Sequence, residues 1–395
     1  MMHLFINSLA ASAGGGLTYI RNVIPQFAIR TDLRVTAALS PGLRSEFARF
    51  SNINFPELEI PSRTRFWYEQ RVLPEVIRRS GASILLSAGN FALRKSPVPQ
   101  ILLSRNSLYI SRDFFHDLRS RHEYRMWLDT HVRAFLAKRS IYWADATVAP
   151  SKAFAEDLEE WAGARVMAIH HGFDREAFSR DCSPLPTQVQ AQIDGLDGCL
   201  KILFVSHYNY YRNFETLVRA LPLLRNRLGG RPVRLLLTCH LAAGMNPGAY
   251  RPDAAAHLVK DLGVSDMVVE LGAIPYQQLH RLYARADIYV TPAYTETFAH
   301  PVVEAMASGV PVVASDLPVH REICGEAGIY FDRFCPEALA DCVFQVANGT
   351  EMRTRMAAQG LKRACEFSWK LHVEQILELS RMLTGSETGS LQSSR

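Results

Sequence analysis

The sequence lacks the marks of a membrane-spanning, secreted or disulfide-bonded protein. No stretch approaches the run of about 18 uncharged apolar residues that a transmembrane helix needs. Residues 1–16 lack the basic segment of a signal peptide. The seven cysteines are scattered, odd in number and without a C-x-x-C pair, which argues against disulfides and a zinc site. We therefore expect reduced thiols and a cytoplasmic protein.

The chain does contain enough apolar sequence for more than one core. Its 395 residues exceed an ordinary single domain, and we predict two. Short apolar runs alternate with helical patterns such as Leu17–Ile29 and Tyr124–Tyr142, which predicts an α/β fold with doubly wound parallel sheets. The predicted strands are His3–Asn7, Ile84–Ser87, Ile101–Ser104, Thr147–Ala149, Leu200–Val205, Arg234–Thr238, Met267–Glu270, Ile288–Val290 and Val312–Ala314.

Composition places the domain boundaries. Residues 1–180 form the expected N-terminal domain, and residues 181–199, rich in Ser, Pro, Gln and Gly, the expected linker. We expect the C-terminal domain at 200–366 and a last helix at 367–384. The polar tail, residues 385–395, is expected to be disordered.

The most informative stretch is residues 284–330, where a strand, a loop, a helix and a second strand are predicted. The helix should begin near His300 and run to Ser308, because Pro301 suits a first turn and Gly309 favours a C-terminal stop. Its N-terminus would follow a strand end and offer an anion site. Glu296 and Glu304 flank this site and suit neutral sugar hydroxyls better than phosphate. The alternative interpretation, taking the two glutamates alone, is that Glu296 caps the helix and Glu304 is a solvated helix residue.

The whole phrase resembles the nucleotide-sugar signature of the retaining "group 1" glycosyltransferases of the GT-B fold. That pattern runs P-S-x-x-E-x-F-G-x-x-x-x-E-A-M-A-x-G-x-P-V-V-A-S. The matching residues here are Pro292, Glu296, Phe298, Glu304, Ala305, Met306, Ala307, Gly309, Pro311 and Val312 to Ser315. Ala299 departs from the pattern, because it stands where the family has glycine, and a methyl group there can crowd the donor.

The resemblance implies two Rossmann-like domains that face each other across a cleft, with the C-terminal helix crossing back. In the C-terminal domain it implies a sugar contact by Glu296 and a ribose contact by Glu304. It places Arg212 and His207 at the family's two diphosphate-binding bases. Guanidinium is a sound phosphate ligand, whereas the charge of His207 would depend on pH. The remaining donor-side positions are Gly272, Ile274, Phe298, Ala299 and His300.

The N-terminal domain carries weaker signals. Gly14, Gly15 and Gly16 form a glycine-rich turn after the first strand, without the spacing of a dinucleotide fingerprint, and the family has a similar loop facing the donor. Asn106 takes the place of a family histidine, so we expect hydrogen bonding from it rather than base catalysis. Arg105 is read equally as a phosphate contact or an ion-pair partner. His170 and His171 are adjacent and cannot both face one metal on a strand.

Positive charge is uneven along the chain. The net charge is +5, yet residues 61–140 hold 15 Lys and Arg against 6 Asp and Glu, a difference of +9. Aromatic residues are interleaved with these bases. No nucleic-acid motif accompanies them, so an anionic membrane surface at the inner face of the cell membrane is the expected partner, with an ordinary solvated surface as the open alternative.

From the resemblance we expect a retaining, metal-independent hexosyltransferase, since no D-x-D phrase is present. It would use a nucleotide-diphosphate sugar as co-substrate, without a cofactor. The acceptor would be a glycan or a lipid-linked molecule, in cell-surface polysaccharide or glycolipid synthesis. The alternatives are a non-enzymatic sugar-nucleotide-binding protein, or another GT-B enzyme such as an epimerase or phosphorylase.

Overall fold

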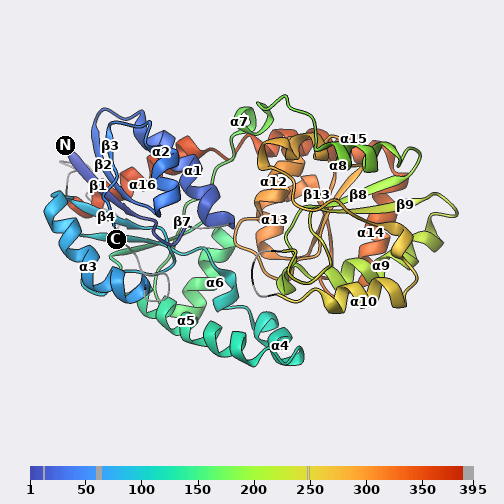
Figure 1. The fold of residues 1–395 in the computed structure, drawn as a ribbon, viewed down its shortest axis with the longest axis horizontal. Helices are drawn as coiled ribbons and strands as arrows, with labels where there is room; N and C mark the ends of the chain where they lie inside the picture. The colour runs from blue at the N-terminus through green and yellow to red at the C-terminus, as the bar shows by residue number, and fades with distance from the viewer. Residues whose placement is uncertain (12–13, 59–64, 247, 249, 386–395) are drawn as a thin grey trace, which may run out of the picture. The chain divides into compact units, whose positions relative to one another are not determined.

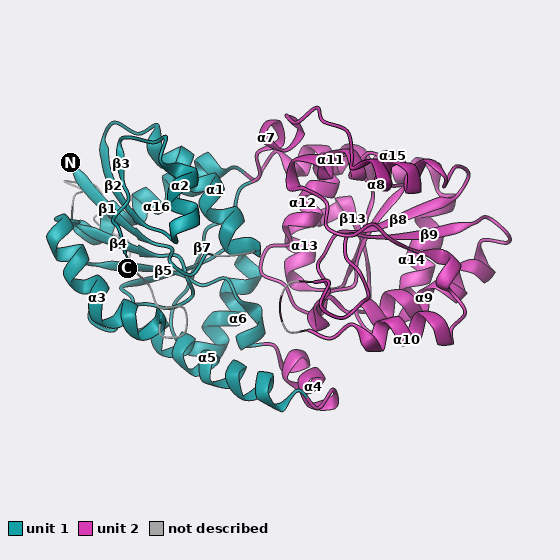
Figure 2. Ribbon diagram, in the orientation of Figure 1, with its two compact units in different colours: residues 1–110, 123–172, 368–395 teal, residues 111–122, 173–367 magenta. Residues whose placement is uncertain are grey.

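A computed structural model describes residues 1–11, 14–58, 65–246, 248 and 250–385. These residues form two compact units (Figures 1 and 2). Unit 1 holds residues 1–110, 123–172 and 368–395, and unit 2 holds residues 111–122 and 173–367. The expected disordered tail lies outside the described residues from 386 onward.

Unit 1 is built on a seven-stranded parallel sheet in the order β3-β2-β1-β4-β5-β6-β7. Most strand residues are buried, which is typical of a parallel sheet covered on both faces. The sheet order reverses between β1 and β4, which are neighbours in the sheet. The strands are β1 Met2–Asn7, β2 Leu33–Ala38, β3 Ile53–Asn54, β4 Ile84–Ser87, β5 Gln100–Leu103, β6 Ala146–Ala149 and β7 Met167–Ala168.

Two apolar clusters cover the two faces of this sheet. Leu4 and Ile6 of β1 join a cluster that includes side chains of α1, α2 and α16, while Phe5 joins a cluster with α3 on the other face. The helix α16 therefore brings the end of the chain back into unit 1. The helices of unit 1 are α1 Gly14–Ala28, α2 Pro41–Phe47, α3 Arg65–Ser80, α5 Tyr124–Trp143, α6 Lys152–Ala162 and α16 Trp369–Thr384.

Unit 2 repeats the pattern with a six-stranded parallel sheet in the order β10-β9-β8-β11-β12-β13. Its strands are β8 Leu200–Phe204, β9 Val233–Leu237, β10 Val268–Glu270, β11 Ile288–Thr291, β12 Val312–Ser315 and β13 Gly328–Phe331. Its helices are α4 Arg112–Ser120, α7 Arg175–Ser179, α8 Thr187–Asp194, α9 Phe214–Arg227, α10 Asp253–Asp261, α11 Leu279–Tyr283, α12 His300–Ala307, α13 Pro318–Cys324, α14 Pro336–Asn348 and α15 Thr350–Ala364.

The unit boundary differs from the one expected at residue 180. Unit 2 begins at Phe173, because Phe178 of α7 packs against Tyr276 and Tyr283 of that unit. The expected linker contains the helix α8, whose Val189 and Ile193 are buried. At the boundary itself Gly172 has no room for a side chain, since a Cβ there would lie 1.9 Å from the backbone nitrogen of Trp369.

The segment 111–122 is an insertion from the first half of the sequence into unit 2. Asp117 accepts a hydrogen bond from the Tyr294 hydroxyl at 2.9 Å, and Arg333 donates to Asp113 at 2.8 Å. Arg121 pairs with Glu215 at 2.9 Å and lies over the ring of Tyr210. These contacts fasten α4 to the loops that follow β8, β11 and β13.

In the described part of the chain, no helix has the length and hydropathy that crossing a membrane requires.

Candidate active site

The chain order of unit 2 reverses between β8 and β11, which lie side by side in the centre of the sheet. In open parallel sheets ligands bind at such a reversal, beyond the carboxyl ends of the strands. The loop after β8 carries His207 and Arg212, and the loop after β11 carries Glu296. The topology therefore brings these three predicted residues to one edge of one sheet.

Arg212 and Glu296 form a direct ion pair at this edge. Nη1 of Arg212 lies 2.6 Å from a carboxylate oxygen of Glu296, and their side chains are only 18% and 11% exposed. The other carboxylate oxygen accepts a hydrogen bond from the backbone N–H of Thr297 at 3.0 Å. Glu296 does not cap α12, whose N-cap is Ala299 without a side-chain cap. The cap alternative for Glu296 is therefore wrong.

Both members of the pair stay charged. Burial by itself lowers the pKa of Arg212, but the neighbouring Glu296 carboxylate outweighs it and the pKa is raised. Burial by itself raises the pKa of Glu296, but the Arg212 charge and the Thr297 N–H outweigh it and the pKa is lowered. The Nε of Arg212 is buried with no hydrogen-bond partner among the described residues. The guanidinium thus keeps a donor that a ligand anion would satisfy.

Asn213 fixes the relative position of the two loops. Its side-chain amide donates to the backbone oxygens of Pro292, at 3.0 Å, and of Arg333, at 2.5 Å. Its backbone is left-handed, with φ 54°, which asparagine tolerates better than most residues. The backbone N–H of Tyr294 also donates to the Tyr211 oxygen at 3.1 Å. Arg212 therefore sits in a loop tied to the loop that carries Glu296.

Glu304 lies inside α12 and is only 4% exposed, so the alternative of a solvated helix residue is wrong. The Tyr283 hydroxyl donates to its carboxylate at 3.0 Å. Burial raises the pKa of Glu304 to about 7, and the tyrosine hydrogen bond offsets only part of that effect. A carboxyl group that titrates near neutral pH can accept hydrogen bonds from neutral hydroxyl groups when it is ionised.

The start of α12 is strained at the position where the sequence pattern has glycine. Ala299 has φ 63° and ψ 59°, a left-handed conformation that costs an alanine roughly 1–2 kcal/mol. The preceding Phe298 is 1% exposed, and its ring packs against Phe367 with centroids 5.3 Å apart. The side chain of Phe298 is therefore part of the core.

A hollow of about 390 Å³ lies beyond the carboxyl ends of β8 and β9, and His207, from the loop that also carries Arg212, lines it. Gly272 precedes the lining residue Ala273. Its φ is 71°, a left-handed value that favours glycine, and a Cβ there would meet Nε2 of His240 at 2.6 Å. Of the lining residues, the sequence pointed to His207 and to the turn that contains Ala273. Thr238 directly follows β9, so the rule that ligands bind beyond the carboxyl ends of parallel strands could have identified it. The sequence of residues 239–246 contains no recognisable motif. The lining residues are His207, Thr238, Cys239, His240, Gly244, Met245, Asn246 and Ala273.

His207 and His320 are neutral imidazoles close to this edge. Burial, and then the charge of Arg212, lower the pKa of His207, so its ring is uncharged at neutral pH without an anion present. His320 is fully buried, and its Nδ1 lies 2.8 Å from the Ser315 carbonyl oxygen, which makes Nδ1 the protonated nitrogen. Its Nε2 then carries a lone pair with no partner among the described residues. No motif or spacing in the sequence pointed to His320.

The predicted residues of unit 1 form their own group. Arg105 donates to the backbone oxygens of Gly15, at 3.0 Å, and Ala88, at 2.5 Å, and lies over the Tyr19 ring. Burial lowers the pKa of Arg105 to about 10. Gly14, Gly15 and Gly16 begin α1, so the glycine turn and Arg105 do meet. Asn106 instead caps a short 3₁₀ turn by accepting from the Leu108 N–H at 3.1 Å.

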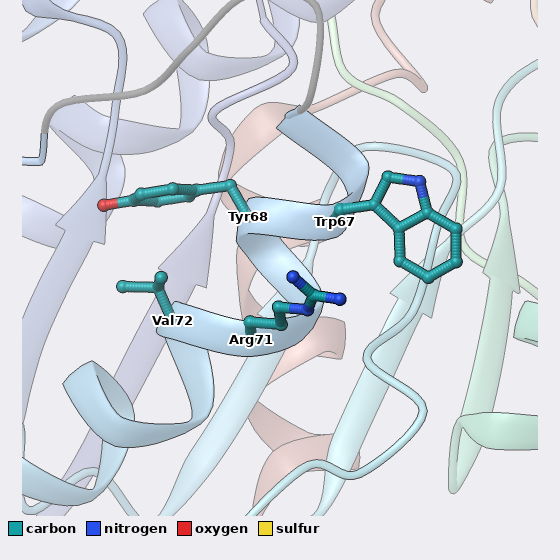
Figure 3. Close-up of a pocket in the computed structure, with 4 residues that line it drawn as sticks. All are labelled: Trp67, Tyr68, Arg71 and Val72. Atoms are coloured by element: carbon teal, nitrogen blue, oxygen red, sulfur yellow. The ribbon is translucent and has the colours of Figure 1, made fainter.

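Two further features do not form sites. His171 is buried among the rings of Tyr19 and Trp369, with centroids 5.4 Å away in each case, which is a packing role. On α3, a surface hollow of about 510 Å³ is lined by Trp67, Tyr68, Arg71 and Val72. Figure 3 shows that Trp67 and Tyr68 point to opposite sides of the helix, so the lining side chains do not converge. Among the described residues no group of three His, Cys, Asp or Glu could hold a metal ion.

Comparison with known proteins assigns both halves of the chain to glycosyltransferases. Residues 191–363 match the family described as "Glycosyl transferases group 1", and residues 13–177 match "Glycosyltransferase Family 4". The chain belongs to the group 1 glycosyltransferase family of the GT-B fold. The group 1 match contains Arg212, Glu296 and Glu304, and the other match contains the glycine turn and Arg105.

Relatives of this glycosyltransferase have related names. A D-inositol 3-phosphate glycosyltransferase of Corynebacterium urealyticum is 28% identical over 246 residues, 61% of this chain and 57% of that protein. The O-antigen chain mannosyltransferase B of Escherichia coli is 34% identical over 113 residues, 29% of this chain and 30% of that protein. The chain thus spans little more than half the length of the first of these relatives.

Solved structures confirm the two-domain GT-B architecture of the glycosyltransferase. A sucrose-phosphate synthase from Thermosynechococcus elongatus superposes with a TM-score of 0.74 at 18% identity, covering 98% of this chain and all of that one. HepE from Anabaena, solved in complex with UDP and glucose, superposes with a TM-score of 0.70 at 18% identity, covering 97% of this chain and all of that one. At these identities the likeness shows the fold alone.

Proposed function

We propose that the protein transfers a hexose from a nucleoside-diphosphate sugar to a glycan or lipid-linked acceptor, with retention of the anomeric configuration. The observation that carries the proposal is the buried Arg212–Glu296 pair at the point where the sheet order reverses. The named relatives act on sugars, and HepE was solved with UDP and glucose, which supports a nucleotide sugar as the donor.

The donor would be held by unit 2 in four parts. The nucleobase and ribose would enter the hollow beside Gly272 and Ile274, with Glu304 accepting hydrogen bonds from the ribose hydroxyls. The diphosphate would meet Arg212, the N-terminal turn of α12 at Ala299 and His300, and His207, whose pKa a bound anion would raise. Glu296 would accept hydrogen bonds from the sugar hydroxyls.

The chemistry would be a front-face displacement without a metal ion. As the bond from the sugar to the leaving diphosphate breaks, negative charge grows on the phosphate oxygen, and Arg212 would stabilise it in place. Glu296 would oppose the positive charge that develops on the sugar ring. The leaving phosphate oxygen would take the proton of the acceptor hydroxyl. The acceptor oxygen would then bond to the sugar from the side on which the diphosphate leaves, so the anomeric configuration would be retained. Arg105 and Asn106 of unit 1 would serve as binding groups rather than as bases.

A panel of nucleotide sugars tests the proposal. The purified protein is incubated with UDP-, GDP- and ADP-linked hexoses, and both nucleoside diphosphate release and the rise in melting temperature are measured. We expect one donor class to give both signals, unchanged by a metal chelator, and the product to keep the donor's anomeric form by NMR. Thermal protection without release, with acceptors supplied, would instead indicate a binding protein that lacks transferase activity.

A further inference from the structure

The helix α5 of unit 1 carries its large apolar residues on the outside. Its buried residues are small or polar for the most part: Thr130, Ala134, Ala137, Ser140 and Ile141. Its exposed residues include five large apolar side chains, each between 53% and 64% exposed, although a solvated helix face is normally polar. We name them the α5 stripe: Tyr124, Leu128, Val132, Phe135 and Tyr142. The helix lies on the outside of unit 1 (Figure 2).

The α5 stripe lies along one side of the helix, and Arg139 stands between Phe135 and Tyr142. At about 100° per residue its members fall within about 80° of one another, and from Tyr124 to Tyr142 they extend over roughly 27 Å. Tyrosines stand at the two ends, with Leu128, Val132 and Phe135 between them. Isolated exposed apolar residues need no explanation, but a row of this length marks an interaction surface.

The charges that α5 itself places beside the α5 stripe have one sign. Arg125 and Arg139 are exposed at its border and within it, and Lys138 lies on its other side. The only acidic residue in the sequence of α5 is Asp129, which points away from the stripe and pairs with Arg133 at 2.7 Å. The surface is therefore apolar and cationic together.

We propose that the α5 stripe docks unit 1 onto an anionic lipid bilayer. Apolar side chains would enter the boundary between headgroups and acyl chains, and Arg125 and Arg139 would pair with lipid phosphates. A second copy of the chain is a less favourable partner for the α5 stripe. Packing two stripes together would place the arginines of both copies side by side, and α5 offers no carboxylate beside the stripe to pair with them. The inference specifies the membrane-side partner of the proposed function, but vesicle binding needs neither donor nor turnover.

Vesicle sedimentation tests this inference independently of catalysis. The full chain is mixed with vesicles of phosphatidylcholine alone, or of phosphatidylcholine with about a third phosphatidylglycerol, at low and high salt. We expect partition to the anionic vesicles to exceed that to the neutral ones by at least about tenfold, and to fall as salt rises.

Two double variants identify the surface. Leu128→Glu with Phe135→Glu should lower partition by about 10- to 100-fold, because apolar contact is lost and two repelling charges are added. Leu371→Glu with Met382→Glu makes the same charge change on exposed residues of α16 in the same unit, and should leave partition within about twofold. Matching melting temperatures for both variants confirm that they are folded.

The inference is overturned by equal losses in the two variants, by equal binding to neutral vesicles, or by no binding at all. It is also overturned if the wild type is a dimer without lipid and the Leu128→Glu, Phe135→Glu variant a monomer, because the stripe then joins two copies. Loss of vesicle binding with donor turnover intact would support the inference, while vesicle binding without any turnover would contradict only the proposed transferase activity.

Discussion

Glu304 should make both stability and donor affinity depend on pH near neutrality. Its ordinary pKa of 4.5 is raised to about 7 in the folded protein by burial. Between these two values the folded state keeps a proton that the unfolded chain has lost, so the free energy of unfolding falls as pH rises from about 4.5 to 7. A difference of about 2.5 pH units, at about 1.36 kcal/mol each, gives a loss of about 3 kcal/mol, complete above pH 7.

The effect on the donor has the opposite sign. Ribose hydroxyls donate hydrogen bonds, and the ionised carboxylate accepts them better than the protonated acid. Binding that selects the ionised form should strengthen about tenfold from pH 6 to pH 8, since the ionised fraction rises by about that factor. The same change in pH therefore weakens the fold and tightens the complex.

Glu304→Gln separates this carboxyl group from the other titrating groups. Urea unfolding of the wild type and the variant between pH 5 and pH 8 gives the stability difference, and calorimetry with the nucleoside diphosphate gives the affinity. Both comparisons are repeated with His207→Gln in the background, because protonation of His207 at low pH would favour a diphosphate. Parallel stability curves for the wild type and Glu304→Gln would refute the reasoning, since the pKa of Glu304 would then be the same in both states.

Three further predictions concern the loops around Glu296. Arg212→Ala should lower turnover at saturating donor by about 100- to 1000-fold with a smaller loss of donor affinity, and Arg212→Lys should recover part of it; near wild-type turnover for the alanine variant would dismiss the catalytic role. Ala299→Gly should be less destabilising than Ala305→Gly, also buried but inside α12, by about 1–2 kcal/mol in urea unfolding, and equal losses would mean that the left-handed backbone carries no strain. Tyr294→Phe and Asp117→Asn, alone and together, should show a coupling of about 1–3 kcal/mol in a double-mutant cycle, whereas additive losses would mean that their hydrogen bond does not hold α4 in place.

Much of the strand and helix framework could be predicted from the sequence. The strands β11 and β12 and the helix α12 lie within one residue of their expected ends, because β-branched runs, Gly309 and Pro311 act locally on the backbone. The position of Arg212 and Glu296 at one sheet edge could be expected as well, since both follow central strands of one parallel sheet, but their ion pair was not predicted. Local rules were sufficient wherever a strand end determined the position of a residue.

The rest depended on contacts between residues far apart in the chain. Asp117 looks like a solvated helix residue until Tyr294, 177 positions later, is placed beside it. The segment with α8 has a linker-like composition, and only the burial of Val189 and Ile193 makes it part of unit 2. His320 gave no signal because its role rests on a buried nitrogen without a partner, which composition and spacing do not reveal.

The division of the chain into units has a consequence for biosynthesis. Because α16 belongs to unit 1, the core around Tyr19 and Ile20 lacks Trp369, Val373 and Ile376 until residues 173–367 of unit 2 have been synthesised. In unit 2, likewise, Asp113 of α4 cannot form its ion pair until Arg333 has been synthesised. The unit whose synthesis starts first is therefore finished last, so the nascent chain exposes apolar surface for most of its synthesis and has a greater need of chaperones than two domains arranged in tandem.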